Sequence, residues 1–140
     1  MKKVFKIDLL LYLVGVMTVA SGITFHIMGH NGYDHHSWVM CAIVHTVISS
    51  VFVWLVAMHL ITHKGWIKGL KNRCCRKKSM ITIILAIIAV VVAVTGFGLL
   101  AVSGANSHLG LLHYKLGIVF ALLAVAHSVR RFRVLKKALK

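Results

Sequence analysis

Four apolar runs, each long enough to cross a lipid bilayer, constrain this chain more than any other feature of its sequence. A bilayer core of roughly 30 Å needs about 20 apolar residues of helix, and four stretches qualify: residues 7–28, 38–62, 80–102 and 109–129. In lipid every backbone N–H and C=O must be paired within its own segment, so each run is expected to be helical even where β-branched residues are dense. The sequence therefore predicts an all-α membrane protein, a four-transmembrane-helix bundle made of two repeated helical hairpins, which forms a single domain over residues 1–140.

The charge of the chain is strongly positive, with 17 Lys and Arg against two acidic residues. A net charge of +15 is typical of nucleic-acid-binding proteins, but here the positions of the basic residues decide otherwise. All of them except Lys115 lie in residues 2–6, 64–78 and 130–140, between the apolar runs. This alternation favours a membrane protein and argues against a nucleic-acid partner.

The same basic segments predict the orientation in the membrane. The connections 29–37 and 103–108 contain no Lys or Arg, so the positive-inside rule places both termini and the middle loop in the cytoplasm. The basic face is then expected to rest on anionic membrane lipid, in the cytoplasmic (inner) membrane of a bacterium or archaeon. The first run resembles a signal peptide, but its apolar stretch continues to Met28, longer than the usual apolar region of such peptides. We expect it to stay as a helix.

Four histidines recur at equal spacing in the second and fourth spans. His45 and His59 are 14 residues apart, and so are His113 and His127. Fourteen residues of helix rise about 21 Å with about 40° of angular drift, so each helix presents two imidazoles on one face, one near each membrane surface. Connectivity makes these two spans parallel. His45 is therefore expected to be level with His113 on the outer side, and His59 with His127 on the inner side.

Two such pairs of imidazoles predict two haem b groups with bis-histidine iron, since a porphyrin is an apolar disc that fits inside a four-helix bundle. Glycine near the histidines supports this interpretation, because close helix approach around a disc favours small residues. Gly22 and Gly96 lie at the depth of the outer pair, and Gly117 lies one turn below His113. Lys115, the one cation in the outer half of a span, is expected either to snorkel to the surface or to pair with a haem propionate.

Other roles for these histidines stay open. A histidine in a membrane helix also serves in hydrogen bonds between helices or in proton paths, and zinc or copper binds imidazole too. Metal ligands gather at one point, however, whereas the predicted pairs are separated along the helices. His63, one turn beyond His59, is the alternative inner ligand, but the second half carries Arg131 at the equivalent place, so His59 is preferred.

The remaining polar residues carry weaker signals. Five histidines lie at the outer end, and they are expected to be solvated or to bond haem propionates: His26, His30, His35, His36 and His108. His26 and His30 are spaced i,i+4, which also allows a peripheral zinc or copper site on one helix face. His26 is the candidate to line an outer quinol or acceptor pocket. Asp8 and Asp34 lie at span edges and are not expected to form an acid/base pair. There is no C-x-x-C-H sequence, so covalent haem attachment is not predicted.

The chain resembles a known family, the small four-helix di-haem cytochromes b of the flavinylation-associated type. The resemblance rests on Ser21-Gly22, residues 38–45, His59, His63, Trp66, Thr95-Gly96, His113 and His127. It covers nearly the whole chain. It implies haem b, electron transfer across the membrane, and association with an extracytoplasmic flavoprotein.

The predicted function is electron transfer through a di-haem b-type membrane cytochrome. The donor is expected to be a membrane quinol or a cytoplasmic reductant, and the acceptor an extracytoplasmic redox protein. With both axial positions of the iron filled, the chain is expected to be a redox carrier rather than an enzyme by itself. Two alternatives remain: a haem-bearing membrane anchor of a larger oxidoreductase, and a histidine-based transition-metal transporter or sensor.

Overall fold

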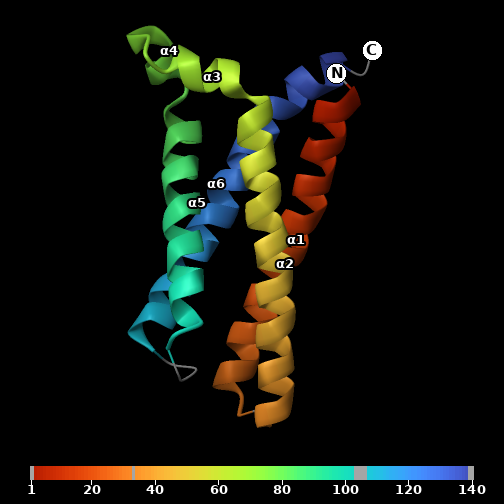
Figure 1. The fold of residues 1–140 in the computed structure, drawn as a ribbon, viewed down its shortest axis with the longest axis vertical. Coiled ribbons are helices and arrows are strands. Elements are labelled where there is room, and N and C mark those ends of the chain that lie inside the picture. The colour runs from red at the N-terminus through yellow and green to blue at the C-terminus, as the bar shows by residue number, and fades with distance from the viewer. Residues whose placement is uncertain (1, 33, 103–106, 139–140) are drawn as a thin grey trace. The chain divides into compact units, whose positions relative to one another are not determined.

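A computed structural model describes residues 2–32, 34–102 and 107–138, and within those ranges the chain forms six helices and no strand (Figure 1). The helices are α1 (Lys2–His30), α2 (His35–Thr62), α3 (Lys64–Gly69), α4 (Arg73–Lys78), α5 (Met80–Leu99) and α6 (His108–Ala138). Four of them, α1, α2, α5 and α6, are long and apolar enough to cross a membrane. The predicted all-α class with four spanning helices is confirmed.

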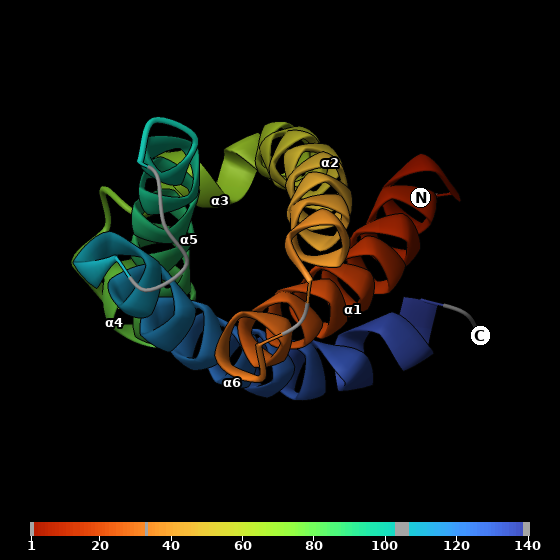
Figure 2. The same cartoon turned by 90° about the horizontal axis from the view of Figure 1, so that it is seen from below.

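The chain folds as two compact units, each built around one helical hairpin. The first contains α1, α2 and α3, and the second contains α4, α5 and α6. Within each unit the two long helices run antiparallel from their connecting turn (Figures 1 and 2). The two repeated hairpins expected from the sequence are therefore present, one in each unit.

A seven-residue period runs along the contact between the two long helices of each hairpin. On α1 and α5 the period falls mainly on small or short side chains, at Asp8, Gly15 and Gly22 and at Thr82, Ala89 and Gly96. On α2 and α6 it falls on a His-Phe-His series, at His45, Phe52 and His59 and at His113, Phe120 and His127. A strict seven-residue repeat keeps one face of a helix on its partner, as in left-handed helix pairs. The histidines therefore belong to the packing face of each hairpin.

Close approach in the first hairpin depends on glycine. A Cβ added at Gly15 would lie 3.0 Å from Cε2 of Phe52, which is tighter than ordinary van der Waals contact. At the turn, Gly32 has φ of 69°, in the left-handed region that glycine adopts without a steric penalty. These two glycines let α1 reverse direction and then lie against α2.

The side chain of Asp34 caps the start of α2. Its Oδ2 accepts a hydrogen bond from the backbone N–H of Ser37 at 3.0 Å, and this bond is the main reason why the pKa of the carboxyl lies below its usual value. A lowered carboxyl pKa means that the cap stabilises the helix at neutral pH and is lost only as the pH falls through the lowered pKa.

The ends of the spans differ from the prediction in two ways. The first and fourth helices extend beyond the apolar core into basic residues, because a helix continues to satisfy its backbone hydrogen bonds outside the lipid. The third ends at Leu99 instead of residue 102: the N–H groups of residues 100–102 bond to carbonyls three residues back, which tightens the chain into turns. In the middle loop, α3 and α4 are short helices that the sequence did not predict.

Apolar side chains on the long helices are largely exposed. Leu55, 2% exposed, is the one buried side chain among those that the structure describes, whereas Trp54 beside it is 61% exposed. In water such a surface would drive association, but lipid tails are as apolar as these side chains and cover them without cost. The exposure pattern therefore supports helices that face lipid.

Candidate functional site

The imidazole of His45 is held by two residues of α1. The Ser21 hydroxyl lies 3.0 Å from Nδ1 of His45 and donates its own proton to the Thr18 carbonyl, also at 3.0 Å. A hydroxyl has one proton, so Ser21 Oγ accepts a hydrogen bond from the Nδ1–H of His45. Next to it, a Cβ added at Gly22 would lie 3.0 Å from Cε1 of the same ring. Serine and glycine together set the orientation of this histidine.

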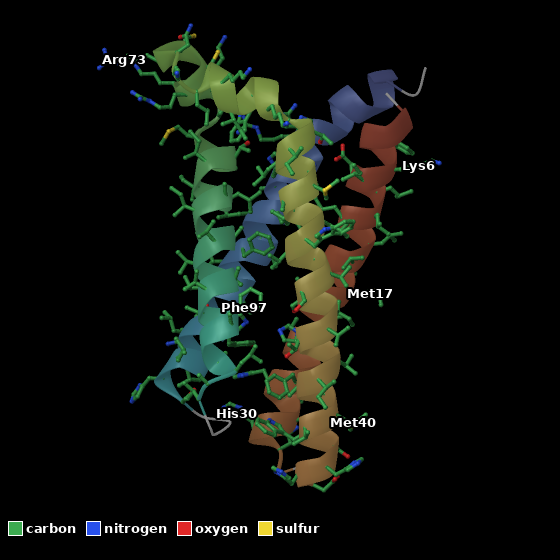
Figure 3. All side chains as sticks on the ribbon, in the orientation of Figure 1. Lys6, Met17, His30, Met40, Arg73 and Phe97 are labelled. Atoms are coloured by element: carbon green, nitrogen blue, oxygen red, sulfur yellow. The ribbon has the colours of Figure 1, made fainter. Side chains whose placement is uncertain are left out.

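The second hairpin repeats this arrangement at His113. The Thr95 hydroxyl lies 3.0 Å from Nδ1 of His113, and its proton is directed to the carbonyls of Val91 and Val92 at 2.9 and 3.0 Å. A Cβ added at Gly96 would lie 3.0 Å from Cε1 of His113. In Figure 3 the labelled Phe97 marks this level of α5. The two hairpins thus place a hydroxyl and a glycine identically against one histidine each.

His59 and His127, each 14 residues further along the same helix, are also bonded through Nδ1 to a polar side chain of the preceding long helix. Nδ1 of His59 lies 2.8 Å from Oδ1 of Asp8, with the side chains 26% and 30% exposed respectively. Nδ1 of His127 lies 3.2 Å from the hydroxyl of Thr82. Asp8 lies two residues from Lys6, whose label in Figure 3 marks the end of α1 remote from the connecting turn.

All four predicted histidines therefore use Nδ1 to bond a polar side chain of the preceding long helix. For His45, His59 and His113 the partner is an acceptor, which places the ring proton on Nδ1. That tautomer carries its lone pair on Nε2, and in metal-binding histidines the nitrogen with the lone pair is the one that coordinates the metal. Fixing one nitrogen of a histidine by an outer contact is how proteins orient metal-binding imidazoles. At His45 the Ser49 hydroxyl lies 3.4 Å from Nε2, at the long end of hydrogen-bond geometry.

The predicted glycine and lysine sites have different surroundings. Gly22 and Gly96 admit the imidazole ring of their own hairpin, so within each hairpin they position a histidine. A Cβ added at Gly117 would meet no described heavy atom within 4 Å. The Lys115 side chain is exposed and lies two residues, about 200° of helix rotation, from His113. Cofactor binding by these four residues stays a prediction.

The expected pairing of His45 with His113, and of His59 with His127, also stays a prediction. The two histidines of each expected pair belong to different compact units, and the structure defines each unit by itself.

The outer-end histidines lie at the turns of the hairpins. His26 and His30 have ring centroids 4.4 Å apart on α1, while His35 stacks near Trp38 with centroids 6.2 Å apart. His36 and His108 are exposed in the first turns of α2 and α6.

One cluster brings together three potential metal ligands in the described part of the chain: Asp8, His59 and His63. Their ligand atoms lie within 4.8 Å of one another, and the rings of His59 and His63 have centroids 4.5 Å apart. The sequence assigned Asp8 no partner, but the antiparallel hairpin brings it opposite His59, 51 positions along the chain.

Sequence reasoning missed Asp8 and Thr82 as histidine partners, although a signal for them exists. Asp8 precedes Ser21 by 13 residues, and Thr82 precedes Thr95 by the same number. In an antiparallel hairpin, polar residues 13 apart on one helix face histidines 14 apart on the other. Within one residue, the spacing of the polar residues in the first helix equals the spacing of the histidines in the second, and this near-equality identifies Asp8 and Thr82.

Comparisons of the chain with protein-family models, with curated proteins and with solved structures give no match.

Proposed function

We propose that the chain is a di-haem b-type cytochrome that moves electrons across a membrane, of the kind found in the small flavinylation-associated cytochromes b that it resembles. The observation that carries the proposal is the Nδ1 anchoring of four histidines, repeated in both hairpins. A histidine that only joined two helices would serve equally well through either ring nitrogen, so it has no need of the same nitrogen bonded in the same way four times over. Ligands to a metal do, because their orientation must be fixed before binding.

The donor set fits haem b. His45 and His113 would hold one haem and His59 and His127 the other, each through Nε2. Held by these histidines, haem b would supply one-electron exchange between the ferric and ferrous states of its iron. The chain's own residues, Ser21, Asp8, Thr95 and Thr82, would hold the imidazoles in place. The two histidine levels of a hairpin are separated by 14 residues, about 21 Å of helix rise, so two haems would stand at different depths.

The basic segments support an orientation with both termini and the middle loop in the cytoplasm. The described loop residues between Lys64 and Lys78 are mostly exposed and carry seven of the basic side chains; Arg73 on α4 is labelled in Figure 3. We place the His59 pair on this cytoplasmic side and the His45 pair outside. The donor would be a quinol or a cytoplasmic reductant, and the acceptor an extracytoplasmic flavoprotein or other redox protein.

Electron transfer is tested in liposomes that enclose ferricyanide, with a reduced, water-soluble quinol outside. With the haem-loaded protein in the bilayer, we expect the enclosed ferricyanide to be reduced, and His59→Ala to lower the rate to that of protein-free vesicles. Electrons must cross the bilayer in either orientation of the protein, so a mixed orientation does not hide the result. Equal rates with and without protein would contradict the proposed transfer.

A second candidate function is supported by the Asp8–His59–His63 cluster. Two imidazoles and a carboxylate within 4.8 Å suit zinc or another first-row transition metal. A site of this kind at the end of a span would serve a transition-metal transporter or sensor.

The variant His63→Ala separates the two functions, because His63 belongs to the metal cluster and not to the haem set. If the chain is a metal protein, haem-free protein binds Zn²⁺ in a calorimetric titration, and His63→Ala or Asp8→Asn weakens binding by about ten- to hundredfold, as expected when a contact at a metal is removed. If it is a cytochrome, His63→Ala retains both haems.

A further inference from the structure

The four anchors of the histidines differ in charge. Three are hydroxyls, from Ser21, Thr82 and Thr95, whereas the fourth is the carboxylate of Asp8. The chain has only two acidic residues, and the other one, Asp34, caps α2 at the turn. Asp8 is thus the one carboxyl within a long helix, and it bonds a proposed haem ligand at 2.8 Å.

We propose that Asp8 lowers the reduction potential of the haem held by His59, so that electron transfer from the His59 pair to the His45 pair is the energetically downhill step; this inference rests on the proposed function. A carboxylate that accepts the Nδ1–H bond makes the imidazole a more electron-rich ligand, and this favours ferric iron. Its negative charge, only partly exposed, favours the more positive oxidation state as well. Both effects act in the same sense.

The hairpins supply the comparison that isolates this effect. At the outer level both anchors are neutral hydroxyls with the same 3.0 Å contact, so Ser21 and Thr95 give no charge difference there. For the proposed inner pair, the anchor of His127 is the neutral Thr82 hydroxyl at 3.2 Å, whereas the anchor of His59 is the charged Asp8 carboxylate at 2.8 Å. The asymmetry is therefore confined to one level, and it makes the His59 pair the poorer electron acceptor.

Other titratable groups of the described residues lie near His59. The ring of His63 has its centroid 4.5 Å from that of His59, while Lys6 and Lys64 carry their charges on exposed side chains, where water and salt screen them. With one electron transferred per step, no proton or covalent bond needs to move. In the proposed orientation, electrons from a quinol or cytoplasmic reductant then run outward to the extracytoplasmic acceptor.

A redox titration of the haem-loaded protein, followed by absorbance, tests the inference. The wild type is expected to show two waves, and Asp8→Asn to raise the lower one by about tenfold in the reduction equilibrium constant, which is ~59 mV for one electron. The upper wave should not move. Thr82→Val and His63→Gln are the matched controls at the same level, and each should shift the lower wave by less than Asp8→Asn.

Two further variants, Asp8→Glu and His45→Ala, test whether the carboxylate and the His59 pair account for the lower potential. Asp8→Glu keeps the carboxylate and should keep the low potential, and in His45→Ala the single remaining haem should be the lower-potential one. A high potential in either variant, or an unmoved lower wave in Asp8→Asn with two haems bound, overturns the inference and leaves the proposed function standing. Failure of the wild type to bind haem overturns both.

Discussion

Replacing His45 and His113 together by alanine is expected to remove one of two haems and to leave the other with an unchanged spectrum. Each haem is proposed to depend on one histidine from each hairpin. The double variant should therefore lose the same single haem as His45→Ala alone. Replacing His59 and His127 together should give the complementary loss. Haem-to-protein stoichiometry of the purified variants, with absorption spectra, measures both.

Crossed double variants test the pairing itself. His45→Ala with His127→Ala removes one ligand from each proposed pair, so we expect no stably bound haem. If instead this variant retains one haem and the His45/His113 double variant retains none, the parallel pairing is wrong and His45 pairs with His127. The exposed His108 provides the control, since His108→Ala should keep two haems.

Gly22→Ala and Gly96→Ala are expected to weaken haem binding at the His45 pair by about ten- to hundredfold, the range for losing an outer contact of a metal ligand. Each new methyl group would lie 3.0 Å from Cε1 of a histidine. The Nδ1 of that histidine is hydrogen-bonded to the residue just before the glycine, Ser21 or Thr95. The ring cannot shift without lengthening that bond. Larger side chains, as in Gly22→Leu, should abolish binding there. Haem titration of the apoprotein measures the change.

Gly15→Ala is the matched control for Gly22→Ala. It introduces the same methyl group on the same helix, also at 3.0 Å from a ring, but the ring is that of Phe52 instead of a histidine. The second hairpin already carries alanine at the equivalent position, Ala89. We expect Gly15→Ala to alter the stability of the hairpin and to leave haem binding unchanged. Equal losses of haem from both variants would show that the glycines matter only for helix packing.

The four spans and the four histidines could be predicted from the sequence because both depend on local rules. Apolar length decides what crosses a bilayer, and helical periodicity decides which residues share a face. Those rules do not predict that His45 and His113 contact the first long helix of their own hairpins. It depends on how two helices approach, and that is determined by the small residues Gly22 and Gly96.

The anchors were harder to predict for the same reason. Ser21 and Thr95 each precede a glycine in the first and third spans, but the sequence alone does not assign their hydroxyls to the histidines. Asp8 seemed to be a boundary residue because an acidic side chain near a basic terminus is common at membrane surfaces. Only the antiparallel pairing of α1 with α2 brings it to His59, across 51 positions of sequence. The short helices α3 and α4 lie in a polar segment whose composition carries no helical period.

The repeat also explains why one hairpin alone is not expected to be the functional unit. Each hairpin supplies one anchored imidazole at each level, and bis-histidine iron needs two. Either hairpin produced separately should therefore fail to give the spectrum of a six-coordinate haem at a one-to-one ratio, unless two copies associate.

The central claim is that the anchored histidines bind two haems, and a reduced-minus-oxidised absorption spectrum of the purified full chain, with haem and protein quantified, tests it most directly. We predict two b-type haems per chain, both six-coordinate in both oxidation states. A chain that binds no haem when expressed with ample haem supply would contradict the claim, and the anchored histidines would then have to be assigned to a transition-metal or proton site.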